Sequence, residues 1–245
     1  MTICTGRMFS GTRHLADQLG LDAPLACVDG SHIVHAPSGR ELSSARLEAP
    51  AAKALLDVLE EFGPAAFAFS DDRVFHASDG VQYLDYVKTW SEQTNEVADL
   101  LDDVDWHGES ASVTAVVALG AEKQIQNAAQ ELARRAPELL QAVSFPAFRA
   151  SRRGAGTTWG MVVRAHGIDK GTAIDWLSRH YGCTPEEIVA VGDWLNDVPM
   201  FRRSGMSFAM NQAPDEVKAA ATQVLEADAW SGGGLAEAAR RAGLL

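Results

Sequence analysis

One short segment restricts the fold of this chain more than any other. The apolar run Ile188–Val191 leads into two pairs of residues that each end in an aspartate, Gly192-Asp193 and Asn196-Asp197. Apolar runs without polar alternation are typical of parallel strands that are covered on both faces. Asp197 follows Asp193 by four residues and returns to the same side if a helix starts there. Since open α/β sheets bind ligands beyond the carboxyl ends of their strands, the segment predicts a ligand site at a sheet edge.

The rest of the chain falls into two patterns. In the last third, strands and helices alternate as in a doubly wound, Rossmann-like parallel sheet, with elements predicted at 161–164, 170–181, 188–191, 207–210 and 215–221. The middle has strands at 65–69, 74–77, 112–119 and 142–148, with helices at 81–90 and 122–136. Such interleaving is typical of a separate α+β unit. We therefore expect an α/β fold whose parallel core (1–46 and 164–245) carries an inserted α+β cap (47–163).

Composition excludes several classes of function. The 245 residues carry a net charge of −12 and no long Lys/Arg run, which argues against nucleic acid as a partner. No apolar run is long enough to span a bilayer, and the N-terminus lacks the pattern of a signal peptide, so we expect a cytoplasmic protein. The three cysteines (Cys4, Cys27 and Cys183) fit a reducing compartment better than a disulfide framework, and none has zinc-ligand spacing.

Three positions are candidates for phosphate chemistry. Asp193 and Asp197 offer the oxygen ligands that Mg²⁺ prefers, although helix N-cap and first-turn acids would look the same. Lys170 begins a predicted helix and would neutralise a phosphoryl group if it pointed to the sheet edge. A solvated lysine is the alternative. Thr5, with the backbone N–H of Gly6, could bind a phosphate oxygen at a strand end, but threonine is common at such ends.

Four segments together resemble one family: Ile3–Arg7, Pro24–Ile33, Gly167–Gly171, and Val191–Asp197 with its continuation Ala209–Val217. In order and spacing they resemble the haloacid dehalogenase superfamily, specifically Cof-type phosphatases with a large α/β cap. The resemblance implies a magnesium-dependent phosphatase that hydrolyses a small phosphorylated metabolite, such as a sugar phosphate, through an aspartyl-phosphate.

The resemblance also implies roles for individual residues. Thr5, Lys170 and Asp193 would be catalytic. Asp193 and Asp197 would hold Mg²⁺, with Asn196 helping to complete that site. The substrate would contact residues from several loops, namely Thr5, Gly6, Arg7, Gly30, Lys170 and Asn196.

The chain departs from the family pattern at three places. Asp29 stands where the family usually has Asn, and Asn211-Gln212 stands where Gly-Asn is usual. The strand-end Asp-x-Asp, whose first Asp would form the aspartyl-phosphate, does not precede Thr5. Three interpretations stay open: the true start lies upstream, the chain is a truncated and inactive relic, or it is a binding module that receives the strand from another chain.

Other acidic or thiol groups are weak substitutes for that motif. Cys27-Val28-Asp29-Gly30-Ser31 resembles Asp-x-Asp-Gly-Thr with Cys as the nucleophile, but its position after Thr5 fits a later strand. Asp103-Val104-Asp105 and Asp71-Asp72 are predicted to be turns.

Two basic groups are also weak candidates. His32 and His35 are predicted to lie at the surface rather than to bind a metal. Arg149, Arg152 and Arg153 are predicted to form a solvated loop, with a grip on an anionic leaving group as the alternative.

Overall fold

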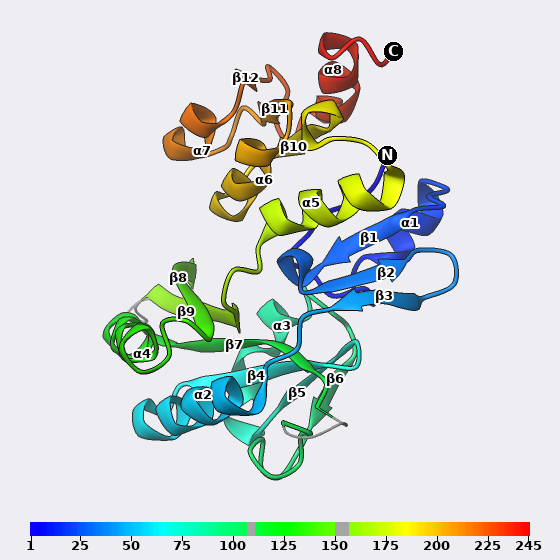
Figure 1. The fold of residues 1–245 in the computed structure, drawn as a ribbon. Helices are drawn as coiled ribbons and strands as arrows, with labels where there is room; N and C mark the ends of the chain where they lie inside the picture. The colour runs from blue at the N-terminus through cyan, green and yellow to red at the C-terminus, as the bar shows by residue number, and fades with distance from the viewer. Residues whose placement is uncertain (107–110, 150–156) are drawn as a thin grey trace. The chain divides into compact units, whose positions relative to one another are not determined.

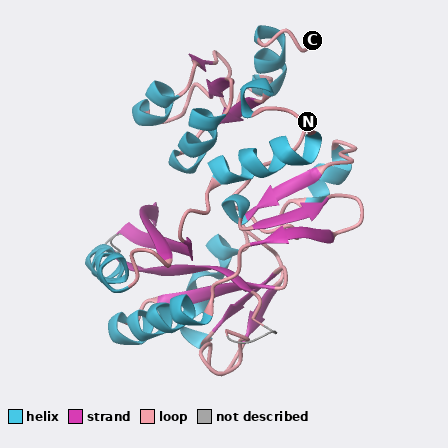
Figure 2. Cartoon of the chain, viewed as in Figure 1, coloured by secondary structure: helices cyan, strands magenta, loops and turns pink. Residues whose placement is uncertain are grey.

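The computed structural model describes residues 1–106, 111–149 and 157–245 (Figure 1). Its contacts divide the chain into two units, Met1–Ile168 and Asp169–Leu245. The described strands form three sheets (Figure 2), of which the first unit holds a three-stranded and a six-stranded sheet and the second a three-stranded one. The protein therefore has a mixed α/β fold. None of the described helices is long and apolar enough to cross a membrane.

The first unit begins with a small antiparallel sheet. After α1 (Arg13–Gln18), it contains β1 (Pro24–Cys27), β2 (His32–His35) and β3 (Arg40–Ser44). The last two strands form an antiparallel hairpin. A single parallel bridge joins Cys4 to Ala26 of β1, so the N-terminal segment runs alongside that strand.

The six-stranded sheet forms most of the first unit, in the order β6-β5-β4-β7-β9-β8. Its strands are β4 (Ala65–Ser70), β5 (Arg73–His76), β6 (Thr94–Glu96), β7 (Val113–Ala121), β8 (Leu140–Arg149) and β9 (Thr157–Ala165). Two amphipathic helices, α2 (Ala49–Phe62) and α4 (Glu122–Arg135), bury Leu55 and Ile125 against one face. The phenylalanines Phe67 and Phe69 on the other face pack against Met8 and other N-terminal residues. Both faces of this sheet are therefore covered.

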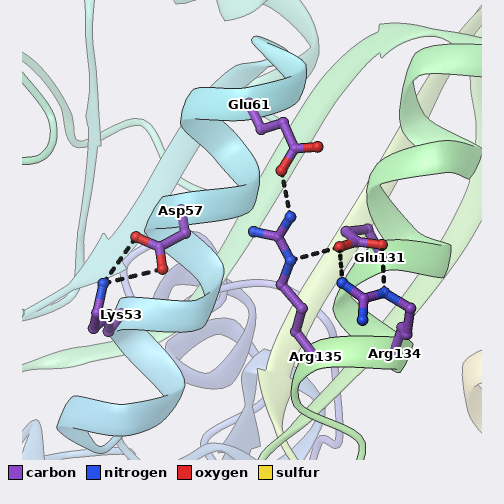
Figure 3. Close-up of polar contacts among 6 residues, drawn as sticks. All are labelled: Lys53, Asp57, Glu61, Glu131, Arg134 and Arg135. Atoms are coloured by element: carbon purple, nitrogen blue, oxygen red, sulfur yellow. Dashed lines mark hydrogen bonds and ion pairs between the residues drawn. The ribbon is translucent and has the colours of Figure 1, made fainter.

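Charged side chains join the two helices at their surface (Figure 3). Arg135 of α4 pairs with Glu61 of α2 and lies 2.6 Å from Glu131, which Arg134 also contacts at 2.5 Å. Hydrogen bonds from Arg134 and Arg135 lower the pKa of Glu131 to about 2. Such solvated pairs contribute little to stability, so the buried apolar faces hold α2 and α4 together.

Two predicted elements differ from the structure. The predicted helix 81–90 is a 3-10 segment, η2 (Ser78–Tyr83), followed by one short turn, α3 (Leu84–Val87). Gly80 packs closely here, since a Cβ at this position would lie only 3.0 Å from the Phe67 ring. The strand predicted at 161–164 is the longer β9, in which Arg164 still pairs with β7 and β8. The expected domain boundary between 163 and 164 therefore falls inside a strand.

The second unit contains a parallel sheet. Its elements are α5 (Lys170–Tyr181), η3 (Pro185–Glu187), β10 (Val189–Gly192), η4 (Leu195–Asp197), α6 (Val198–Arg203), β11 (Met206–Ala209), α7 (Asp215–Ala220), β12 (Gln223–Val224) and α8 (Gly234–Arg241). The order is β10-β11-β12, with Phe208, Leu225 and Ala238 in its core. Among the described strands, only β11 pairs with β10. Val189 and Val191 are half-buried, whereas the sequence predicted a strand covered on both faces.

Candidate functional site

A polar cluster follows the carboxyl end of β10. Asp197 is 3% exposed, and its Oδ1 lies 2.5 Å from Nζ of Lys170, which is 6% exposed. Its Oδ2 accepts hydrogen bonds from the backbone N–H groups of Asp193 (2.8 Å) and Trp194 (2.9 Å). One buried carboxylate thus binds the lysine with one oxygen and closes the loop after β10 with the other.

Lys170 is held by the start of its own helix. Asp169 caps α5 by accepting a hydrogen bond from the backbone N–H of Thr172 at 2.9 Å, so the helix begins at Lys170. The lysine side chain then runs to Asp197 instead of into solvent. The interpretation of Lys170 as a solvated lysine is therefore wrong.

The backbone at Gly192 makes room for this arrangement. A Cβ at this position would lie 2.5 Å from both Cγ and Oδ2 of Asp197, closer than van der Waals contact permits. The Asp197 carboxylate accepts N–H groups that precede it in the chain, and no side-chain cap bond forms at the start of α6. Asp197 is therefore not the side-chain N-cap of α6, but it is a first-turn acid of η4 whose carboxylate accepts the N–H of Trp194 and closes the loop.

Asp193 is the exposed acid of the cluster. Its Oδ2 accepts a hydrogen bond from Nε2 of Gln212 at 3.2 Å, and Oε1 of Gln212 accepts one from the backbone N–H of Ala229 at 3.1 Å. The sequence had assigned no role to Gln212 beyond its departure from the family pattern. The structure shows that this side chain links Asp193 to the loop around Ala229.

The donor set suits magnesium better than a transition metal. The described residues contain no group of three or more His, Cys, Asp or Glu side chains that could enclose an ion. Magnesium needs no such cage, because it usually binds through one or two carboxylates and keeps several waters. An exposed Asp193 beside the buried Asp197 fits that mode.

A second group of predicted residues lies in the first unit. Thr5 donates its backbone N–H to the Ala26 carbonyl at 2.8 Å, and its Oγ1 accepts the backbone N–H of Arg7 at 3.1 Å. Its carbonyl accepts the N–H of Asp29 at 2.8 Å, which brings Gly30 next to the Thr5–Arg7 segment. Thr5, Gly6, Arg7 and Gly30 thus gather in one unit, while Lys170, Asp193, Asn196 and Asp197 gather in the other.

The weak acidic candidates are turns, as predicted. Asp71 and Asp72 have φ values of 47° and 58° and connect β4 to β5. Oδ1 of Asp72 accepts the backbone N–H of Ser10 at 2.9 Å. The exposed Asp103 accepts the N–H of Asp99 at 3.0 Å within its own loop.

The remaining candidates are paired, buried or outside the described residues. His32 lies 3.3 Å from Glu41, and His35 lies 3.1 Å from Asp22. Cys27 is fully buried, and burial raises the pKa of its thiol, which disfavours it as a nucleophile. Of the three candidate arginines, Arg149 is the last residue of β8, and Arg152 and Arg153 lie outside the described residues.

Comparison with known proteins identifies the family. Residues 1–238 match the haloacid dehalogenase-like hydrolases, so the chain belongs to that family. The resemblance to Cof-type phosphatases that the four sequence segments indicated is confirmed.

Curated relatives include two phosphatases. A pyridoxal phosphate phosphatase of Escherichia coli is 24% identical over 234 residues, which cover 92% of this chain and 80% of that protein. A phosphoglycolate phosphatase of Nitrosopumilus maritimus is 36% identical over 70 residues, 29% of this chain. That match spans 30% of the relative's length.

Solved structures share the fold. A haloacid dehalogenase-like hydrolase of Bacteroides thetaiotaomicron superposes with a TM-score of 0.79 at 21% identity, over 98% of this chain and 85% of that chain. A subclass IIB sugar phosphatase superposes with a TM-score of 0.75 at 20% identity, over 100% and 85% of the two chains.

Proposed function

We propose that this protein is a magnesium-dependent phosphatase that hydrolyses the monoester of a small phosphorylated metabolite. The observation that carries the proposal is the buried contact of Lys170 with Asp197 beside the exposed carboxylate of Asp193. Burying an ammonium and a carboxylate costs desolvation energy that apolar residues would avoid. The buried Lys170–Asp197 pair lies beyond the end of a parallel strand, which supports a catalytic role for the cluster.

In this proposal Asp193 is the direct ligand of Mg²⁺. Asp197 completes the site by ordering the loop, and Asn196 faces the substrate. A bound Mg²⁺ would neutralise charge on the phosphoryl oxygens. Lys170 places a positive charge at the same carboxyl end of β10. Its contact with Asp197 holds the side chain in place before substrate binds.

The Thr5–Arg7 segment is proposed to bind the phosphoryl group. The Thr5 hydroxyl and the N–H of Gly6 would donate hydrogen bonds, and the exposed guanidinium of Arg7 would add a charge-assisted contact. Gly30, held beside Thr5, leaves space for the substrate because it has no side chain.

The nucleophile of the proposed mechanism is an aspartate on a strand-end Asp-x-Asp. The Asp103 loop does not take that role, since Asp103 is exposed and its carboxylate accepts the N–H of Asp99 within its own loop. In the proposed architecture residues 1–46 and 164–245 form a doubly wound core with 47–163 as its cap, and since β9 ends at Ala165, the second core segment begins after that strand. In such a core the Asp-x-Asp strand would pair along the edge of β10 that no described strand occupies.

The substrate class rests on the relatives. Their names point to pyridoxal phosphate, phosphoglycolate and sugar phosphates, all small phosphomonoesters. A sugar phosphate is the substrate we propose to test first.

The first experiment titrates the 245-residue protein with Mg²⁺ and with inorganic phosphate in a calorimeter. Asp193→Asn should weaken Mg²⁺ binding at least about tenfold, because it removes the charged ligand. Asp175→Asn is the matched control, since Asp175 is an acid of α5 that pairs with Arg203. Equal Mg²⁺ affinity in wild type and Asp193→Asn would refute the metal assignment.

A second experiment tests catalysis. Phosphate release from the three ester classes is measured for the 245-residue protein and for a version extended through any upstream in-frame Asp-x-Asp. Turnover that requires the extension and Asp193 supports the phosphatase. Binding of Mg²⁺ and phosphate without turnover in the extended version would favour a module that binds a phosphorylated metabolite.

A further inference from the structure

A strained turn follows β1. Val28, Asp29 and Gly30 have φ values of 50°, 53° and 99°, so three consecutive residues adopt left-handed conformations. Such a conformation is a genuine outlier for a β-branched residue such as Val28. It persists only where surrounding contacts determine it, and this kind of strain concentrates at functional sites.

The backbone of the turn is bonded to the proposed phosphate segment. The N–H of Val28 donates to the Arg7 carbonyl at 2.9 Å, and the N–H of Asp29 donates to the Thr5 carbonyl at 2.8 Å. Both donors bond to backbone carbonyls of the Thr5–Arg7 segment. A change in the turn would therefore move that segment.

The side chain of Asp29 holds the turn from the other side. It forms an ion pair with Nη1 of Arg164, and the two side chains are 8% and 4% exposed. Arg164 lies in β9, between Ala115 of β7 and Gln141 of β8. A residue paired to strands on both sides has a fixed backbone, so Arg164 is a firm anchor.

The contact between Arg164 and the turn does not serve stability alone. Ser31 Oγ and Arg164 Nε are buried without a hydrogen-bond partner among the described residues. Buried polar atoms without partners are rare and reduce stability. An apolar contact between β9 and the turn would avoid this cost, which points to a purpose beyond packing.

We propose that Arg164 is a positioning residue. Through its ion pair with Asp29 it keeps residues 28–30 in their strained conformation, and this turn in turn holds Thr5–Arg7 in the geometry that receives phosphate. That the ligand is a phosphoryl group rests on the proposed function. The anchoring of the segment is a separate, structural claim. The family usually has Asn where this chain has Asp29. The ion pair with the buried Arg164 explains the charge at this position.

Hydrogen exchange followed by mass spectrometry tests the anchoring. The variants are Arg164→Gln, Arg164→Lys and the neutral pair Asp29→Asn with Arg164→Gln, so that a conclusion remains if one fails to fold. Arg46→Gln is the matched control, because Arg46 of the same unit forms a half-exposed pair with Glu41 at 3.3 Å. Peptides covering 1–8 and 24–31 report on the segment, and peptides covering 122–135 report on the rest of the unit.

In Arg164→Gln we expect protection of 1–8 and 24–31 to fall at least about tenfold more than that of 122–135, equivalent to about 1.4 kcal/mol. Arg164→Lys should restore part of it, and Arg46→Gln should match wild type. The double variant Asp29→Asn with Arg164→Gln should fold more stably than Arg164→Gln. Its peptides 1–8 and 24–31 should still lose protection. Equal losses in all peptides, or no loss in 24–31, would overturn the positioning role.

Phosphate titration of the same variants separates this inference from the proposed function. Arg164→Gln should bind inorganic phosphate at least about tenfold more weakly than wild type and Arg46→Gln. If wild type binds no phosphate, the phosphate assignment of Thr5–Arg7 fails, while the exchange experiment still decides whether Arg164 holds the turn. If wild type binds and Arg164→Gln binds equally well, the positioning role is wrong.

Discussion

Nζ of Lys170 lies 2.5 Å from Oδ1 of Asp197, and the two side chains are 7% and 5% exposed. The lysine begins α5 and the aspartate ends η4, so 27 residues separate the partners in the chain. The same carboxylate also accepts the N–H groups of Asp193 and Trp194. The Asp197 carboxylate therefore links the ion pair to the loop that presents Asp193.

Removing the lysine charge should destabilise the second unit. In Lys170→Met the Asp197 carboxylate stays buried without its cation, which typically costs about 3–5 kcal/mol. Urea unfolding followed by tryptophan fluorescence measures the loss. Arg203→Gln, which breaks the more exposed pair with Asp175, should cost about 1 kcal/mol or less. Similar losses in both variants would contradict the importance of the buried pair.

Adding a methyl group at Gly192 should displace Asp197. The new Cβ would lie 2.5 Å from the Asp197 carboxylate, so Gly192→Ala should weaken Mg²⁺ binding at least about tenfold by moving the loop. Gly182→Ala is the control, because Gly182 has a φ of 66° and open space around it. That variant costs only backbone strain, about 1–2 kcal/mol. Calorimetric titration of Gly192→Ala with wild-type affinity would show that the loop adapts.

The half-buried carboxylate of Asp72 should make stability depend on pH. Burial raises its pKa above the ordinary 3.8, so the folded state favours the protonated form. Its contribution to stability is present below pH 3.8 and is lost as the pH rises through the folded-state pKa. Asp72→Asn should therefore be more stable than wild type at pH 7, with a difference that shrinks toward pH 3.8.

Thermal melts between pH 3.5 and 7 measure this difference. Asp71→Asn makes the same substitution in the same left-handed turn at an exposed position. If Asp71→Asn stabilises as much as Asp72→Asn, the gain comes from the turn preference of asparagine and not from the buried charge.

Cys27 should resist alkylation in the folded protein. It is fully buried, and burial raises the pKa of its thiol, so little reactive thiolate forms. Cys4 and Cys183 are partly exposed and should react with iodoacetamide at pH 8 before Cys27, as peptide mass spectrometry would show. In denaturant all cysteines should react alike. Rapid alkylation of Cys27 in the native protein would reopen the interpretation of Cys27 as the nucleophile.

Local rules account for the elements that the sequence predicted well. Helix 170–181 was predicted with its exact bounds because Asp169 caps it and Gly182 ends it in a left-handed conformation. The strand before Asp193 followed from its unbroken apolar run, which needs no knowledge of neighbours. The predicted helix 81–90 is a 3-10 segment followed by one short turn, because apolar residues three or four positions apart share one face in either kind of helix.

The candidate site divides in the same way. Residue types and spacing indicated Asp193 and Asp197 as candidate metal ligands, and the resemblance to a known family added Lys170. Only the tertiary structure decided that Lys170 is buried on Asp197, that Gln212 reaches Asp193, and that Arg164 reaches Asp29 across 135 residues. Local sequence determines the ends of an element where caps and stop residues are strong, as at 170–181. Which charges meet depends on how distant strands pair, and the spacing of residues along one sequence carries no record of that.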